Sequence, residues 1–519
     1  MSTRKHKWSV CLLAATMMIS LLGGCDTRKA YSAAEDDGPV TLWVLAEDVG
    51  CSYNIGSWDR ESDMRAVLKQ LAKEYETGHE GVTVELEFLP SANDAPEERE
   101  RRLEQLRTEI MAGGGPDVYL LPGSTGSSML FPDVVQSMRS GLFYDISAFY
   151  DADDGLGKET LVTAVMDAGL VGEARYVLPL RYNCPVIYTT KTAIEGAGLN
   201  EEELASGVNS LYDALTATKD PDWTRYAWPW YYRGAFSVFP DLIDYDTQSV
   251  ALTVQDVAEY LRRYQMLSSV EISYPQLSSW DVYASRGVYP LTDGYVEYPG
   301  NQSIEDAFAG AGYGGTIMKD HALLYAGSLD EALDIAIVAQ TVGMELEMFP
   351  LRATDGSLID SVTYWGAVGA GSGHPELAYE FLRLSLLEDT QWERNRPLEQ
   401  RRNTIIYTRG RVTAGWPVRT VGSAEALWEQ YRKRIAATSG TSDAGAAQRI
   451  RNILRTVSVT AADIPLLDVE INEVRFGLSA ESTFRGALMQ LSYTDPAEID
   501  VVALAEELID TLRWHISEG

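Results

Sequence analysis

Cysteine and histidine are both scarce in this chain. It has four cysteines and five histidines among 519 residues, so neither a disulfide-rich scaffold nor a zinc cluster is indicated. Cys11 and Cys25 lie near the N-terminus, which leaves Cys51 and Cys184 for the folded body. These two could form one disulfide or remain buried thiols, and both alternatives stay open. We expect no bound metal ion and no cofactor.

Hydrolase motifs are also missing. Apart from His6, the histidines are His79, His321, His374 and His515, which are widely separated, and no H-E-x-x-H or G-x-S-x-G motif occurs. A zinc-dependent or serine-dependent hydrolase is therefore not expected, and we expect a protein that is not an enzyme. Acidic residues are abundant, so a glycosidase that uses two carboxylates stays open as an alternative.

Basic residues are too few to balance the acidic ones. The chain has 43 Lys and Arg against 76 Asp and Glu, a formal charge of −33. A surface this acidic repels nucleic acid and anionic lipid and favours solubility outside the cell. We therefore exclude nucleic acid as a partner.

Long apolar runs are limited to the N-terminus. A basic start leads into the apolar run 10–22, which is shorter than the ~20 residues that a spanning helix needs and is typical of a secretory signal peptide. No other apolar stretch of about 18 residues follows, so we expect no transmembrane helix. Residues 26–39 are small and polar, which is typical of a flexible tether.

The residues that end this signal resemble a lipoprotein processing site. Leu22-Gly23-Gly24-Cys25 is similar to the lipobox of bacterial lipoproteins, in which residues 1–24 would be removed and Cys25 acylated. The resemblance implies a mature chain of charge −36, since three basic residues leave with the signal. It also implies attachment to the outer face of the cell membrane through lipid alone. An ordinary signal cleaved elsewhere is the alternative.

The first folded segment has the pattern of an α/β domain. We expect strands over 41–45, 82–88 and 118–121, separated by helices over 64–75 and 96–110, with glycines ending each helix. The β-α-β-α-β order predicts an open, largely parallel sheet. Ligands bind beyond the carboxyl ends of such strands, where Glu47, Asp48 and Ser124 would lie. A solvated loop and a simple turn are the alternatives there.

Two motifs with apparent ligand chemistry are interpreted as structural. The glycine-rich stretch 310–315 matches G-x-G-x-x-G, but it follows a predicted helix and precedes a predicted strand, the reverse of the dinucleotide-binding order. The acidic stretch 151–155 departs from the spacing of a calcium-binding loop. We interpret the first as a loop and the second as a solvated acidic turn.

Aromatic residues are concentrated in one stretch. Residues 223–239 hold eight aromatics in seventeen positions. Aromatic planes pack against the C–H faces of sugar rings, and each ring can bury roughly 150–250 Å², so the stretch predicts a saccharide site. Packing in a domain core is the alternative for any one of these rings. Trp228, Trp230 and Tyr231 are the candidates from this stretch, and Trp280, Tyr283, Tyr364, Trp365 and Trp416 are candidates elsewhere.

Three groups of motifs, from residue 41 onward, resemble family 1 of the extracellular, periplasmic-type solute-binding proteins of carbohydrate import. The stretch 107–119 is similar to the helix, glycine stop and strand of the family's first lobe. The stretches 141–146, 176–180 and 187–188 resemble the first crossing between lobes, and 349–350, 366–370 and 376–382 resemble the return crossing and its following helix. The stretch 220–300 matches no strong family motif.

The resemblance implies a type II-like fold of two α/β lobes, each a mostly parallel sheet flanked by helices and joined by hinge strands. Lobe one would comprise 40–183 and 321–371, and lobe two 184–320 and 372–519. Tyr182 and Asn183 would lie at the hinge. Together the candidate ligand-binding residues are Glu47, Asp48, Ser124, Tyr182, Asn183, Trp228, Trp230, Tyr231, Trp280, Tyr364, Trp365 and Trp416.

The function that the resemblance implies is solute capture for an ABC importer. A monomeric, lipid-anchored receptor would enclose a carbohydrate, with an oligosaccharide favoured, and deliver it to two transmembrane permease subunits powered by a cytoplasmic ATPase. No nucleotide would bind to this chain. A surface lipoprotein enzyme acting on glycans and a receptor of the same fold for a peptide or polyamine are the alternatives.

Overall fold

A computed structural model describes residues 38–47, 63–92, 95–123, 129–200, 202, 206–217, 238–270, 325–329, 346–387, 416–418, 473–493 and 496–518. The chain divides into an N-terminal unit, Met1–Val40, and a body, Thr41–Gly519. The predicted signal, Cys25 and most of the tether lie outside the described residues. Within the described part, no helix is both long and apolar enough to cross a membrane.

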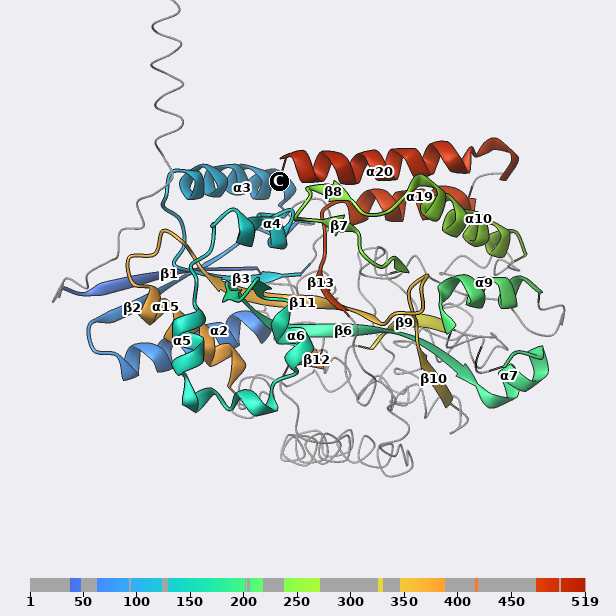
Figure 1. Ribbon diagram of the computed structural model, residues 1–519. Helices are drawn as coiled ribbons and strands as arrows, with labels where there is room; N and C mark the ends of the chain where they lie inside the picture. The colour runs from blue at the N-terminus through green and yellow to red at the C-terminus, as the bar shows by residue number, and fades with distance from the viewer. Residues whose placement is uncertain are drawn as a thin grey trace, which may run out of the picture. The chain divides into compact units, whose positions relative to one another are not determined.

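The body is an α/β structure (Figure 1). Its described α-helices are α2 (Asp63–Gly78), α3 (Pro96–Met111), α4 (Val134–Arg139), α5 (Ser147–Ala152), α6 (Thr163–Asp167), α7 (Lys191–Ala197), α9 (Val208–Ala217), α10 (Val254–Val270), α15 (Pro375–Arg383), α19 (Glu481–Tyr493) and α20 (Val501–Glu518). Its described strands are β1 (Val40–Ala46), β2 (Val82–Phe88), β3 (Val118–Pro122), β4 (Leu170–Val171), β5 (Ala174–Arg175), β6 (Val177–Thr190), β7 (Ile243–Asp244), β8 (Ser249–Val250), β9 (Tyr325–Leu329), β10 (Leu346–Pro350), β11 (Ile359–Val368), β12 (Trp416–Pro417) and β13 (Glu473–Phe476).

The predicted β-α-β-α-β order at the start of the body is confirmed by β1, α2, β2, α3 and β3. Helix α2 buries Leu68 and Tyr75, which lie on its apolar face. Helix α3 begins at Pro96, whose fixed φ suits the first helical position. It ends before Gly113, which has a positive φ of 83° and reverses the chain. Local periodicity therefore accounts for this segment.

The main sheet is mixed in direction. The strand order along the sheet is β10-β6-β11-β3-β1-β2. Strands β9 and β12 also pair with β6, and β13 pairs with β11. The β1–β3 and β11–β13 pairs are parallel, whereas β11 runs antiparallel to both β3 and β6. The predicted parallel pairing thus holds for β1 and β3. Direction changes where β11 returns to the sheet, because it enters between β6 and β3 from the opposite end.

Strand β6 contributes to two separate hydrophobic clusters. The first cluster includes Val177 of β6, and it also contains Leu45, Leu106, Tyr119 and Trp365. The second includes Ile187 of β6, and it also contains residues of α9, α10, α19 and α20. Helices α10, α19 and α20 pack against one another (Figure 1). One continuous strand therefore contributes residues to both cores.

Two segments beyond residue 371 contact elements of the first half of the chain or the first cluster: α15 contacts Tyr75 of α2, and β13 contributes to the first cluster. In α15, the ring of Phe381 lies 5.5 Å from that of Tyr75, and the backbone oxygen of Leu377 accepts a 2.9 Å hydrogen bond from the Tyr75 hydroxyl. Phe476 of β13 is a member of the first cluster. The division that places 372–519 in lobe two stays a prediction. Pairing of β13 with β11 is non-local and leaves no local signal in the sequence.

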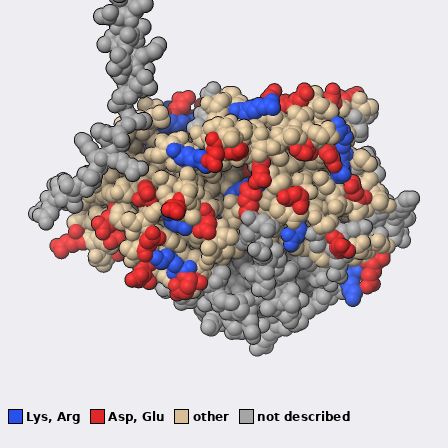
Figure 2. Space-filling view, viewed as in Figure 1, with Lys and Arg blue, Asp and Glu red and all other residues tan. Residues whose placement is uncertain are grey.

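The described surface carries charge of both signs. On the face drawn in Figure 2, Asp and Glu are spread over the described residues with Lys and Arg between them. Some charges form pairs: Arg102 bonds Glu87 at 2.6 Å and lies over the Trp43 ring at 5.6 Å. Hydrogen bonding to Glu87 raises the pKa of Arg102 further, so this guanidinium stays charged at all ordinary pH values.

Candidate functional site

The carboxyl ends of β1 and β3 lie at the same edge of the sheet, because these strands are parallel neighbours. Glu47 follows β1, and its amide donates to the Leu120 oxygen at 3.0 Å. Gly123 follows β3, and its amide donates to the Thr363 oxygen at 2.9 Å. Strands β11 and β6 continue the sheet beside β3. We refer to this region, from Glu47 to Asn183 of β6, as the strand-end edge.

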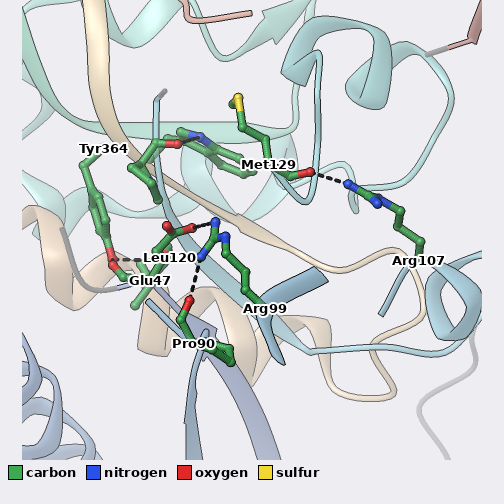
Figure 3. Close-up of polar contacts among 9 residues, drawn as sticks. Glu47, Pro90, Arg99, Arg107, Leu120, Met129 and Tyr364 are labelled. Atoms are coloured by element: carbon green, nitrogen blue, oxygen red, sulfur yellow. Dashed lines mark hydrogen bonds and ion pairs between the residues drawn. The ribbon is translucent and has the colours of Figure 1, made fainter. Parts of the chain in front are cut away.

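Glu47 is held at the strand-end edge by a buried arginine (Figure 3). Arg99 of α3 is 1% exposed. Its Nη2 donates to Glu47 Oε2 at 2.9 Å, and its Nη1 donates to the Pro90 oxygen at 3.0 Å. A buried charge requires such partners because leaving water is costly. Glu47 is therefore a fixed, negatively charged group just inside the edge.

A second arginine of the same helix fixes the chain that follows β3. Arg107 donates to the Met129 backbone oxygen at 2.6 Å (Figure 3). Burial raises the pKa of Tyr119 on β3, and the nearby charges of Asp117 and Glu109 raise it further. The phenol of Tyr119 therefore remains neutral. Helix α3 thus positions both the acidic group after β1 and the segment after β3.

Tyr364 and Trp365 of β11 are buried, and their polar atoms bond the main chain. The Tyr364 hydroxyl donates to the Leu120 oxygen at 2.8 Å, and it lies 3.2 Å from the Glu47 oxygen. The Trp365 Nε1 donates to the Pro122 oxygen at 3.2 Å. Both side chains are at most 2% exposed. The two buried side chains therefore bond backbone oxygens at the strand-end edge.

Replacing Trp365 with Phe tests this placement. The indole packs against Phe131, Phe143 and Phe476 in the first cluster, so the smaller ring leaves a void and an unpaired Pro122 oxygen. We expect a loss of about 1–3 kcal/mol in the free energy of unfolding, measured by urea denaturation. Solute affinity per folded molecule should change little. A stable variant with abolished binding would contradict the packing role.

Strand β6 brings further polar side chains to the strand-end edge. Arg181, Tyr182 and Asn183 are each at most 8% exposed. In the strand register, Asn183 lies opposite Ser361 and Tyr182 opposite Val362. Among the described residues, the Asn183 Nδ2 has no hydrogen-bond partner. Such a group costs roughly 1–3 kcal/mol when left unpaired, so Asn183 is suited to donate to a bound oxygen.

The remaining predicted residues are partly or wholly beyond the described structure. Trp416 lies on β12, opposite Tyr182, and only its backbone is described. Cys184 is placed on β6 in the same way. Residues outside the described ranges are Cys25, Asp48, Cys51, Ser124, Trp228, Trp230, Tyr231, Trp280 and Tyr283. The glycine-rich stretch 310–315 also lies outside them.

The acidic turn at 151–155 has a structural role in the described body. Asp153 forms an ion pair with Arg383 of α15, with Oδ1 to Nη2 at 2.9 Å. Its Oδ2 accepts a hydrogen bond from the Tyr379 hydroxyl at 3.2 Å. The carboxylate therefore ties α15 to the chain after α5. Over the described ranges, no cluster of three or more metal-ligating side chains occurs.

Sequence reasoning missed Arg99, Arg181 and Asp360, which are all buried charged residues. Each had a signal. Arg99 lies four residues before Leu103 and seven before Leu106, so it falls on the apolar face of α3. Arg181 follows the apolar run Val177–Leu180 of β6, and Asp360 lies next to the apolar Ile359 in β11. A charged residue at an apolar position indicates a paired or functional group.

Comparison with known proteins identifies the fold. No model of a known family matches the chain, and no curated protein matches it. The solved structure of the sugar-binding protein MalE from Xanthomonas citri is 12% identical and matches with a TM-score of 0.50, over 92% of this chain and 98% of MalE. The chain has the same fold. The predicted two-lobed α/β periplasmic-binding-protein fold is thereby confirmed.

Other solved structures match over similar lengths. A de novo designed cysteine esterase, ECH19, is 13% identical with a TM-score of 0.50, over 92% of this chain and 98% of that chain. An extracellular solute-binding protein of family 1 from Alicyclobacillus acidocaldarius is 12% identical with a TM-score of 0.46, over 93% of this chain and 99% of that one. Because a sugar-binding protein and an esterase share this fold, the fold alone does not decide function.

Proposed function

We propose that this chain is a receptor that binds a carbohydrate between its two lobes and delivers it to an ABC permease. One observation carries the proposal: β6 has residues in both hydrophobic clusters, and Asn183, on β6 between Val177 and Ile187, has an Nδ2 without a hydrogen-bond partner among the described residues. A group in this position can bind a solute that contacts both lobes. The sugar-binding protein MalE has the same fold, which supports this reading.

The chemistry of the strand-end edge suits a polyhydroxylated solute. Sugar hydroxyls need donors and acceptors in fixed positions. Asn183 Nδ2 supplies a donor on β6, and the Glu47 carboxylate, fixed by Arg99, supplies a charged acceptor group after β1, with β3 and β11 between them in the same sheet. The aromatic stretch 223–239 would add planar surfaces for the sugar rings. An oligosaccharide fits this combination of rings and polar groups.

The two lobes would close because the solute binds the closed state more tightly than the open state. A solute that contacts both lobes stabilises the closed state, because both sets of contacts form only there. No bond of the solute is broken in this mechanism. The lipid on Cys25 would keep the monomeric receptor at the outer face of the membrane, and thus at a high effective concentration near its permease. A surface enzyme acting on glycans, and a receptor for a peptide or polyamine, remain the competing functions.

A ligand screen with an Asn183 variant tests this proposal. We expect saturable thermal stabilisation by one of a set of trisaccharides, such as maltotriose, cellotriose or mannotriose, and none by spermidine or a tripeptide. Asn183→Ala should weaken that binding about 10- to 100-fold, since one buried hydrogen bond is lost. The melting temperature without ligand should fall only slightly, because Nδ2 makes no hydrogen bond to the described residues and the void left by the side chain is small.

Asn209→Ala is the matched control. Asn209 lies on α9 and also has a buried side-chain atom without a described partner, its Oδ1, but it is not at the strand-end edge. Its substitution should leave sugar affinity unchanged. Stabilisation by spermidine alone would refute the sugar assignment. Release of monosaccharide during incubation with the trisaccharides would instead support the alternative function, a surface enzyme that acts on glycans.

A further inference from the structure

Three distant segments of the chain meet at Asp133. Asp133 caps the N-terminus of α4, where its Oδ1 accepts a hydrogen bond from the Gln136 amide at 2.9 Å. Its Oδ2 accepts one from the Tyr245 hydroxyl, also at 2.9 Å. The Nε2 of His515, near the end of α20, lies 3.6 Å from the same Oδ2. We call Asp133, Tyr245, Ser479 and His515 the Asp133 junction.

The Asp133 junction connects the two hydrophobic clusters. Val134 and Met138 of α4 belong to the first cluster, whereas Leu512 of α20 and Leu242, just before β7, belong to the second. Figure 1 shows α4, β7 and the C-terminal end of α20 in one region. Backbone contact reinforces the connection, since the Ser479 amide donates to the Pro132 oxygen at 3.1 Å. Relative motion of the clusters would therefore strain or break this junction.

His515 is buried and incompletely bonded. Both His515 and Asp133 have side chains that are 3% exposed. The His515 Nδ1 lies 3.2 Å from Ser479 Oγ, and among the described residues its Nε2 has no hydrogen-bond partner. Asp133 Oδ2, at 3.6 Å, lies slightly beyond hydrogen-bond length from this Nε2. A small approach of α20 to α4 would complete a bond from Nε2 to this carboxylate.

Among the described residues, His515 is the basic side chain that lies within ion-pair distance of the Asp133 carboxylate. Two nearby arginines have acidic partners: Arg139 bonds Asp246 at 2.7 Å, and Arg475 bonds Glu473. The described hydrogen bonds to the Asp133 carboxylate come from an amide and a hydroxyl, which are neutral donors. Its negative charge is thus available to an imidazolium. Of the described charged groups, Arg139 and Arg475 act on Tyr245, which bonds Asp133, and their partners Asp246 and Glu473 accompany them.

We propose that His515 is an acid-sensitive clasp between the two clusters. When protonated, its Nε2–H donates to Asp133 Oδ2 and its Nδ1–H donates to Ser479 Oγ, which holds α20 against α4. When the imidazole is neutral, the ionic part of this contact is lost. Charge-assisted hydrogen bonds are stronger than neutral ones, so the joined state binds the proton more tightly than the separated state. The junction is then tightest in mild acid and loosens as pH rises.

The pH window follows from ordinary side-chain chemistry. Histidine titrates near pH 6.5 in the absence of perturbation, and aspartate near 3.9. The test therefore compares pH 7.5 with pH 5.5, a range in which a free histidine side chain gains a proton and a free aspartate does not. Asp133 also stays the better N-cap as a carboxylate, because a helix N-terminus favours negative charge. A lipid-anchored receptor outside the cytoplasm would experience such changes in its surroundings.

Hydrogen exchange of the ligand-free protein tests the clasp. We expect amide protection in segments 132–140 and 505–518, corrected for intrinsic exchange rates, to rise at least about fivefold from pH 7.5 to pH 5.5 relative to the rest of the body. His515→Gln should remove this rise. Asp133→Asn should also remove it while keeping the helix cap, since Asn caps as well as Asp. The second variant keeps the test decisive if the first does not fold.

His79→Gln is the control. His79 also contacts a carboxylate, that of Glu380 at 3.0 Å. This contact joins the residue after α2 to α15 and involves no residue of the Asp133 junction. This variant should keep the wild-type rise in segments 132–140 and 505–518. The proposal is overturned if protection in the wild-type protein is unchanged or lower at pH 5.5. It is equally overturned if either junction variant shows the full rise. No solute is present, so the outcome does not depend on the carbohydrate proposal.

Discussion

Replacing Arg99 with Leu should cost about 3–5 kcal/mol in the free energy of unfolding. The substitution leaves the Glu47 carboxylate, whose side chain is 11% exposed, without its guanidinium, and breaking one side of a buried pair costs this much. The Pro90 oxygen loses a donor as well. Differential scanning calorimetry at neutral pH would measure the loss. We also expect weaker solute binding, since Glu47 is no longer held at the strand-end edge.

Arg102→Leu is the matched control for this experiment. Arg102 is on the same helix and forms a 2.6 Å ion pair with Glu87, but the two side chains are 21% and 28% exposed. Partly exposed pairs contribute about 1 kcal/mol or less, so this variant should lose little stability. Adding Glu47→Gln to Arg99→Leu should recover part of the loss, because the unpaired charge is removed. No recovery would show that Arg99 acts through packing rather than charge.

Gly123→Ala should be comparably damaging. A Cβ at this position would lie 1.7 Å from the Val362 oxygen and 2.7 Å from its carbonyl carbon. Both are backbone atoms of β11, so they cannot turn aside as a flexible side chain would. The main-chain bonds of Gly123, to the Thr363 oxygen and from the Gly477 amide, would be distorted. We expect a loss of about 3 kcal/mol or more, seen as a lower melting temperature and a poor yield of folded protein.

Gly486→Ala provides the opposite expectation for the same chemical change. Gly486 is inside α19, and a Cβ there meets no atom within 4 Å. Alanine in a helix interior is more favourable than glycine by roughly 0.5–1 kcal/mol. This variant should be slightly more stable than the wild-type protein. If Gly123→Ala were equally stable, β11 would have to lie farther from β3 than the structure places it.

Local patterns in the sequence were enough to predict the first five elements of the body. Alternation of apolar residues defines β2, and a spacing of three and four defines the buried face of α2. Glu47 and Gly123 could be assigned to one edge because parallel strands align their carboxyl ends. Those arguments need only neighbouring residues, so one sequence suffices for them.

The neighbours of this segment in the sheet could not be predicted in the same way. Strand β11 pairs with β3 across 244 residues, counted from Leu120 to Tyr364, and periodicity carries no information about such a partner. Tyr364 and Trp365 were predicted to bind the solute, which stays untested, but their burial at 2% and 1% exposure depends on this pairing and could not be predicted. Arg99 was missed for the opposite reason. Its position on an apolar face was visible, but its partner, Glu47, lies on another element.

The pairing of β3 with β11 has a consequence for biosynthesis. At ordinary translation rates, of about 5–20 residues per second, Leu120 leaves the ribosome roughly 12–50 s before Tyr364. During that interval β3 lacks the neighbour that covers one of its sides, and the strands that follow cannot complete the first core. A nascent chain in this state exposes a bare strand edge, which is prone to aggregate. A chaperone that shields residues 118–122 would therefore bind the nascent chain before the second half of the protein has been synthesised.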